Sequence, residues 1–187
     1  MKDGKGQIDE TVQLLKKELG PNLLSVILYG SAAENGLKRY SDVDLLIIIK
    51  SGLSFQNKMN LVSGLMNISV PIGSEHKGRY IELTAVTGSN LLYLEYPPVE
   101  EFQYGEWMRE EFLLGNLPER GRNPDLAILF KQALQNHQVI CGESMKHFIT
   151  EIPAEYIQNA IKDLLPEIWM EDAGDERNTI LTLAECG

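Results

Sequence analysis

Two apolar runs of strand length lie within the first fifty residues, and a polar segment separates them. The first covers residues 23–29 and ends at Gly30, and the second covers residues 42–50. Every position from Leu45 to Ile49 in the second run is apolar, which is typical of a strand buried on both faces. A third run, residues 79–87, alternates between apolar and polar positions and predicts another strand.

Apolar residues at helical spacing occur before, between and after these strands. The first helical pattern stops at Gly20-Pro21, where a helix end belongs, and a later one is followed by Gly142. In the last of them Pro166 is expected to kink or end the helix. The patterns predict helices over residues 8–19, 55–68, 124–140 and 153–169, and the start of one more over residues 179–184.

Chemically distinctive residues stand where the first strand ends and the second begins. Gly30-Ser31 ends the first, and Asp42-Val43-Asp44 opens the second. Glycine permits a tight turn that brings backbone N–H groups close to a ligand. Residues two apart in a strand share a face, so Asp42 and Asp44 project together, and a pair of close carboxylates favours a divalent cation. The pattern predicts Mg²⁺ held against nucleotide phosphates, with the Gly-Ser turn at the same phosphates.

Each of these short motifs also occurs alone in ordinary solvated turns. Their order favours the functional interpretation, because a strand, a Gly-Ser turn, a polar segment and a D-x-D at a buried strand follow one another. A P-loop would need G-x-x-x-x-G-K-[ST], and a dinucleotide-binding turn would need G-x-G-x-x-G. Neither motif occurs in the chain.

Composition restricts the partners only slightly. The chain has 187 residues, 43% of them hydrophobic and 24% charged, as expected of a globular protein. Its formal net charge of −10 argues against a nucleic-acid backbone as partner and suits a cationic small molecule. The first ten residues are polar and do not resemble a signal peptide, and no apolar run is long enough to span a membrane. The two cysteines lack C-x-x-C spacing, which fits a reducing cytoplasm. The three histidines show no metal-ligand spacing.

The motifs together resemble the aminoglycoside (3'')(9) adenylyltransferases, which confer streptomycin and spectinomycin resistance and belong to the DNA polymerase β-like nucleotidyltransferase superfamily. The resemblance runs from about Leu23 to the last residue. The matching segments are Leu28-Tyr29-Gly30-Ser31-Ala32, Gly36-Leu37-Lys38, Ser41-Asp42-Val43-Asp44-Leu45-Leu46, Gly105-Glu106-Trp107, Asp125-Leu126-Ala127-Ile128-Leu129 and Ala173-Gly174-Asp175-Glu176-Arg177-Asn178.

The resemblance implies an α+β palm fold, with a mixed sheet flanked by helices, and transfer of AMP from ATP to an antibiotic hydroxyl. Asp42 and Asp44 would bind two Mg²⁺ ions, and Gly30, Ser31 and Ser41 would hold the phosphates of ATP. Glu82 resembles the general base, because the third palm strand lies beside the second. A glutamate on a solvated strand face is the plain alternative for Glu82.

The antibiotic side of the site is also implied by the resemblance. Trp107 would form a wall for the drug, although a single tryptophan is more often a core residue. Asp175 matches an acidic contact to the aminocyclitol, and Trp169 is a candidate near the domain junction. The expected domains are a nucleotidyltransferase domain over residues 1–120 and an incomplete helical domain over residues 121–187, as in a truncated product or an isolated part of a longer protein.

Two other functions remain open at this point. A palm enzyme of this size could adenylylate a protein hydroxyl, as minimal nucleotidyltransferase antitoxins do, or the chain could be a palm that binds a nucleotide without catalysis. The helices after Pro124 and the Gly-Glu-Trp segment argue against a protein acceptor. A binding role should survive Asp44→Ala, whereas AMP transfer should not.

Overall fold

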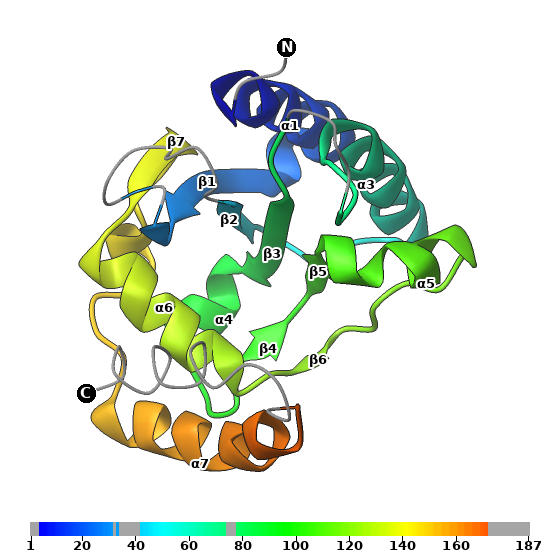
Figure 1. The fold of residues 1–187 in the computed structure, drawn as a ribbon. Coiled ribbons are helices and arrows are strands. Elements are labelled where there is room, and N and C mark those ends of the chain that lie inside the picture. The colour runs from blue at the N-terminus through cyan, green and yellow to red at the C-terminus, as the bar shows by residue number, and fades with distance from the viewer. Residues whose placement is uncertain (1–3, 32, 34–41, 74–77, 172–187) are drawn as a thin grey trace.

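Five strands form one mixed sheet in the computed structural model of the chain (Figure 1), which describes residues 4–31, 33, 42–73 and 78–171, with side chains as far as residue 165. The strand order is β5-β3-β2-β1-β7. β2 and β3 are parallel, and the other neighbouring pairs are antiparallel. The strands are β1 (Leu23–Tyr29), β2 (Val43–Ile49), β3 (Ile81–Thr87), β5 (Phe102–Tyr104) and β7 (Gln138–Gly142). A small ribbon pairs β4 (Val99–Glu100) with β6 (Gly121–Arg122).

Helices cover both faces of this sheet (Figure 1). α1 (Gly4–Leu19) and α3 (Phe55–Ile68) pack side by side on one face. α6 (Asp125–Gln135) lies on the other face, and α7 (Ala154–Glu171) packs against α6. The shorter elements are α4 (Gly88–Leu92), α5 (Arg109–Leu113) and the 3₁₀ turns η1 (Gly20–Asn22), η2 (Glu106–Met108) and η3 (Met145–His147).

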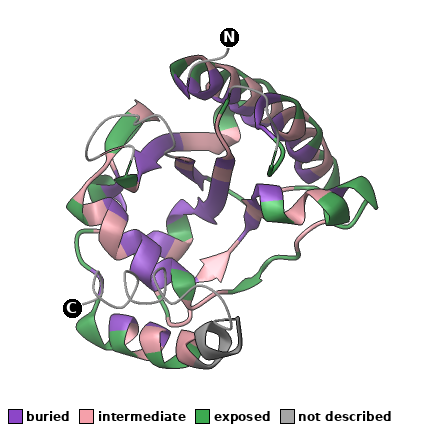
Figure 2. Cartoon of the chain, in the orientation of Figure 1, coloured by how far each residue is buried: buried purple, intermediate pink, exposed green. Residues whose placement is uncertain are grey.

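Two apolar cores, one on each face, hold the layers together (Figure 2). In the first core, between the sheet and α1 with α3, β2 contributes Val43, Leu45, Ile47 and Ile49, all fully buried. In the second core, between the sheet and α6 with α7, β2 contributes Leu46 and Ile48, also fully buried. Successive strand residues point to opposite faces, so one continuous apolar run supplies both cores. The predicted burial of this strand on both faces is confirmed.

The predicted palm fold is confirmed, and most predicted elements lie within two residues of the observed ones. α1 ends at Leu19, and the next residue, Gly20, has a positive φ of 48° that is easy only for glycine. α3 begins at a capping box in which the Ser54 hydroxyl accepts from the backbone N–H of Asn57 at 3.1 Å. Local sequence chemistry therefore sets both helix limits.

The predicted helix over residues 124–140 is wrong in its second half. α6 ends at Gln135, and residues 138–142 form β7, which pairs with β1 at the edge of the sheet. Hydrogen bonds to a strand more than a hundred residues away outweigh the continuing helical pattern, which is a tertiary effect. The fifth strand thus comes from the segment beyond residue 120, and the division after residue 120 stays a prediction.

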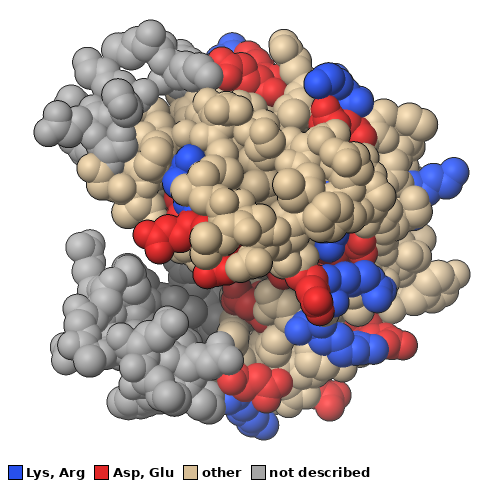
Figure 3. Space-filling view, turned by 90° about the vertical axis from the view of Figure 1, so that its right-hand side faces the viewer, with Lys and Arg blue, Asp and Glu red and all other residues tan. Residues whose placement is uncertain are grey.

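Of the two effects expected of Pro166, an end of the helix is wrong, since α7 continues to Glu171, whereas a kink stays a prediction. The predicted helix start at residues 179–184 lies outside the described residues. Within the described part of the chain, no helix combines the length and apolarity needed to cross a membrane. On the face drawn in Figure 3, basic and acidic side chains are interspersed, and acidic ones gather along the hollow in the middle of that face.

Candidate active site

Three neighbouring strands place polar side chains at one level of the sheet. Tyr29 on β1 pairs with Asp44 on β2, and Asp44 pairs in turn with Glu82 on β3. Tyr29 belongs to the second core, so this row faces α6. The predicted separation of faces on β3 is observed as well, because Ile81, Leu83 and Ala85 all enter the first core. Parallel pairing of β2 with β3 therefore brings Asp44 and Glu82 together.

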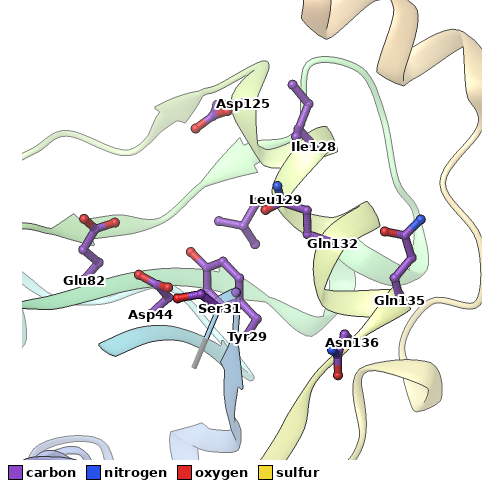
Figure 4. A pocket seen from close by; sticks show the side chains of 11 residues that line it. Tyr29, Ser31, Asp44, Glu82, Asp125, Ile128, Leu129, Gln132, Gln135 and Asn136 are labelled. Atoms are coloured by element: carbon purple, nitrogen blue, oxygen red, sulfur yellow. The ribbon is translucent and has the colours of Figure 1, made fainter. Parts of the chain in front are cut away.

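A cavity of about 600 Å³ opens between this row and α6 (Figure 4). The sheet supplies carboxylates to one wall, and α6 supplies apolar and amide side chains to the other. A space of this size accommodates a ligand of nucleotide size. The lining residues are Tyr29, Gly30, Ser31, Asp44, Glu82, Asp125, Ile128, Leu129, Gln132, Gln135 and Asn136.

Gly30 forms the turn between the β1 strand and Ser31 in a conformation that disfavours other residues. Its φ is +67°, and a Cβ atom added there would lie 2.5 Å from Oδ2 of Asp44. The backbone of the turn therefore approaches the carboxylate as closely as it does only because residue 30 lacks a side chain. The positive φ confirms that glycine makes the tight turn, whereas the approach of its N–H groups to a ligand stays a prediction. Ser31 lines the cavity beside it.

The carboxylates of the site carry strongly perturbed pKa values. Burial, together with the charge of Asp42, raises the pKa of Asp44 to about 6. Burial and the charges of Asp44, Asp42 and Asp125 raise the pKa of Glu82 to about 7. The like charges disfavour full ionisation in the absence of a cation, so the site favours a bound positive charge.

The donor set fits Mg²⁺ held jointly by protein and substrate. Asp42, at the start of β2, is half-buried, and burial raises its pKa against the opposing effect of Arg79. Among the described side chains, no group of three carboxylates, thiols or imidazoles is arranged to enclose a metal alone. Mg²⁺ in nucleotide enzymes commonly takes one or two carboxylates and completes its shell with phosphate oxygens and water. Asp42 and Asp44 match that requirement.

The other predicted site residues lie elsewhere or outside the described residues. Ser41 and Asp175 are outside them, and Trp169 is on α7 beyond the described side chains. Trp107 is in η2, immediately after the edge strand β5, and is 53% exposed. It is therefore no core residue, although it does not line the cavity itself.

Sequence reasoning missed the α6 wall of the cavity. Asp125, in the first turn of α6, faces the carboxylates of the sheet across the cavity, and burial raises its pKa (Figure 4). Ile128, Leu129 and Gln132 follow it along the same helix. The only local signal was an acidic residue directly after Pro124 at a helix start, which elsewhere is a common capping feature. Tyr29 was missed also, because it reads as the last residue of a buried strand.

The fold and the site define the class of protein. A family model described as polymerase beta nucleotidyltransferase matches residues 9–90, which include the Gly-Ser turn, both aspartates and Glu82. The chain therefore contains the nucleotidyltransferase domain that the resemblance implied. Strands β1, β2 and β3, which carry the candidate site, all lie within the matched region.

Similarity to characterised proteins identifies the family more closely. The chain is 39% identical over 178 residues to a spectinomycin 9-adenylyltransferase of Staphylococcus aureus, covering 95% of the chain and 68% of that protein. It is 33% identical over 183 residues to an aminoglycoside (3'')(9) adenylyltransferase of Klebsiella pneumoniae, covering 95% of the chain and 69% of that protein. The chain belongs to the aminoglycoside (3'')(9) and spectinomycin 9-adenylyltransferase family.

A solved relative agrees in three dimensions. The crystal structure of spectinomycin adenyltransferase AAD(9) from Enterococcus faecalis, with ATP and spectinomycin, superposes with a TM-score of 0.91 at 35% identity. The match covers 97% of the chain and 73% of that structure. The resemblance stated from the sequence is thereby confirmed.

Proposed function

We propose that this chain transfers AMP from ATP to a hydroxyl group of spectinomycin, streptomycin or both, releasing pyrophosphate. The observation that carries the proposal is the pairing of Asp44 with Glu82 on parallel strands at the floor of a nucleotide-sized cavity. Relatives that share at least a third of its residues are named for this reaction on spectinomycin or aminoglycosides. The two drugs are alternative acceptors for one chemistry.

ATP would lie with its triphosphate against the Gly30 turn. Backbone N–H groups near Gly30 and the hydroxyl groups of Ser31 and Ser41 are suited to bind the β- and γ-phosphates. Asp42 and Asp44 would hold two Mg²⁺ ions, which when bound supply charge neutralisation and lower the pKa of the attacking hydroxyl. The residues of this site would mainly position and neutralise charged groups, as phosphoryl transfer requires.

Glu82 would act as general base. The drug hydroxyl oxygen forms a bond to the α-phosphorus of ATP, the bond from that phosphorus to the bridging oxygen breaks, and pyrophosphate leaves. The hydroxyl proton passes to the Glu82 carboxylate. In the metal-free protein, burial and the neighbouring carboxylates raise the pKa of Glu82 to about 7. With Mg²⁺ bound, this pKa would be lower, which favours the ionised form that a base requires.

The cationic drug would be held by Glu82 itself and by the drug contacts that the resemblance implies. Glu82 and Asp175 would supply negative charge, and Trp107 and Trp169 would supply aromatic surface, which attracts cations. The net charge of −10 adds a general attraction for a polycation. We place the reaction in the cytoplasm, where ATP and Mg²⁺ are supplied.

A mass-spectrometric transfer assay tests the proposal. Protein, ATP and Mg²⁺ are incubated with each drug, and the product is expected to gain the mass of one AMP residue. Asp44→Ala should give none, whereas Asp9→Ala, which alters an exposed carboxylate on α1, should match wild type. An AMP adduct on protein with unmodified drug would instead support a protein acceptor, and absence of every adduct would contradict the proposal.

A further inference from the structure

Gly105 is the residue that follows β5, the edge strand that pairs with the strand of the proposed general base. β5 is antiparallel to β3, with Tyr104 opposite Leu83. Extending this register by one residue places Gly105 beside Glu82. Tyr104 and Leu83 both enter the first core, and Gly105 is extended with φ −152° and ψ 155°. Because side chains alternate along extended backbone, the missing side chain of Gly105 would point to the face that carries Glu82.

The indole ring of Trp107 fills the space above Gly105. A Cβ atom added at Gly105 would overlap three carbon atoms of that ring, Cη2, Cζ3 and Cζ2. Since this Cβ would point to the face of Glu82, the ring lies on that face, at the edge of the sheet next to the base. The Trp107 side chain stays about half exposed, so part of the ring is free to contact a ligand.

The residue between them, Glu106, anchors the turn that carries the indole. Its side chain is buried, accepting a hydrogen bond from the Tyr104 hydroxyl at 2.6 Å and from Nε and Nη2 of Arg109 at 2.6 and 3.0 Å. Nη2 of Arg109 also donates to the Met66 carbonyl on α3 at 3.0 Å. A buried, bidentate and charge-assisted pair of this kind fixes geometry more strongly than a solvated one. The turn that carries Trp107 is thus linked to the first core through the hydrogen bonds of Glu106 and Arg109.

We infer that Gly105 and Glu106 are positioning residues, which hold the Trp107 indole beside Glu82 as a platform for a protonated amine of the acceptor substrate. The inference rests on the proposed function for the identity of that substrate. Gly105 leaves the space that the ring occupies, and Glu106 fixes the turn. An aromatic face next to a carboxylate attracts a cation both through its π-electrons and through the neighbouring charge.

A double-mutant cycle tests whether Gly105 acts through Trp107. Gly105→Ala is expected to raise KM for the drug roughly 2- to 30-fold, with KM for ATP unchanged. Gly121→Ala is the matched control, because an added Cβ there meets nothing within 4 Å. In a Trp107→Leu background, Gly105→Ala should have no further effect on KM for the drug. A full effect of Gly105→Ala in that background, or none in wild type, would overturn the inference.

Glu106 is tested by the same cycle with a conservative partner. Glu106→Ala should raise KM for the drug in the presence of Trp107 and not in its absence. Glu106→Gln keeps the shape and part of the hydrogen bonding, so it should restore much of the wild-type KM. Equal effects of Glu106→Ala with and without Trp107 would show a purely structural role, and the part of the inference that concerns Glu106 would fall.

A measurement without substrate separates this inference from the proposed function. The chain has two tryptophans, so Trp169→Phe leaves Trp107 as the only one, and its emission can be excited selectively over that of the tyrosines. Gly105→Ala in that variant should shift the emission maximum and increase quenching by acrylamide, while Gly121→Ala should change neither. Failure of AMP transfer together with this spectral change would defeat the proposed function but keep the positioning of Trp107. An unchanged spectrum would overturn the positioning whatever the transfer assay shows.

Discussion

The two faces of the sheet are built largely from the same three strands, β1, β2 and β3, but one face is an apolar core and the other carries the candidate site. On the face covered by α1 and α3, Val43, Leu45, Ile47 and Ile49 continue the apolar core to both ends of β2. On the face covered by α6, Leu46 and Ile48 extend the apolar core along only part of β2. The residue of that face at the start of the strand is the carboxylate Asp44. One face is a closed core, and the other is a core that opens into a cavity.

The difference shows how a strand separates stability from chemistry. Residues one apart along β2 or β3 point to opposite faces, so Leu83 is packed while its neighbour Glu82 faces the cavity. The carboxylates can be crowded together at a cost in stability because the opposite face is fully apolar. Substitutions on the two faces should therefore have opposite profiles, with activity lost from one and stability from the other.

The largest effect is expected from Asp44→Ala. Loss of a carboxylate that would hold the metal and phosphates removes several kcal/mol of transition-state stabilisation, so AMP transfer should fall by at least about 10³-fold. The melting temperature should not fall, because one crowded negative charge is removed. Product mass spectrometry measures the AMP transfer, and thermal unfolding measures the melting temperature. Residual transfer within about tenfold of wild type would remove Asp44 from the catalytic role.

Glu82→Gln should reduce kcat by about 10²- to 10⁴-fold, the usual contribution of a general base. The amide keeps the shape of the side chain and cannot take the proton, so KM for ATP should change little. Steady-state kinetics with the drug that proves to be the acceptor measures this. An unchanged kcat would mean that Glu82 is only a drug contact and that the proton leaves by another route.

Leu83→Ala, one residue further along β3, should show the opposite profile. Its side chain is fully buried in the first core, and such truncations cost about 2–5 kcal/mol of stability. Folded protein should retain most of its kcat below the melting temperature. Urea unfolding and kinetics on the same sample compare the two quantities. A loss of kcat as large as that of Glu82→Gln would contradict the separation of the two faces.

Gly30→Ala should affect the site more than the fold. Gly115 offers a matched control, since both residues have positive φ but only an alanine at Gly30 would press on Asp44. Each substitution should cost about 1–2 kcal/mol through backbone strain. Only Gly30→Ala should also lower kcat/KM for ATP, because Asp44 and the phosphate-binding turn are displaced. Equal kinetics of the two variants would show that the close approach is unimportant.

The smallest effect is a pH dependence of stability in the metal-free protein. The folded-state pKa values of Asp44 and Glu82, about 6 and about 7, exceed those of an unfolded chain, so the folded state binds more protons. Stability should therefore decline as pH rises from about 4 to about 7, by roughly 1 kcal/mol after allowance for solvent screening. Thermal unfolding with a chelator measures this decline. The Asp44→Asn, Glu82→Gln double variant should lose most of the slope, with Asp42 and Asp125 supplying the remainder, and an unchanged slope would assign it to other groups.

Sequence patterns within a few residues were sufficient to predict much of the wall that the sheet contributes to the cavity. The alternation of β3 indicated that Glu82 faces away from Leu83, and the D-x-D spacing indicated that Asp42 and Asp44 share a face. The resemblance supplied the pairing of β2 with β3 that brings these residues together. Local pattern failed at β7, because residues 138–142 continue a helical repeat and become a strand only by pairing with β1. Local pattern also failed to predict the α6 wall of the cavity, since nothing near Asp125 in sequence shows that α6 faces the carboxylates.

The sequence by itself therefore determined strands β1, β2 and β3, the Gly-Ser and D-x-D motifs, and the opposite faces of Glu82 and Leu83, because these follow from backbone geometry within a few residues. Only the tertiary structure decided which helix closes the cavity, how close Gly30 stands to Asp44, and that the Trp107 ring covers Gly105 after β5. These depend on strand pairing and packing between residues far apart in the chain. The free energies of strand pairing and packing come from contacts between distant residues, which no short stretch of the sequence contains.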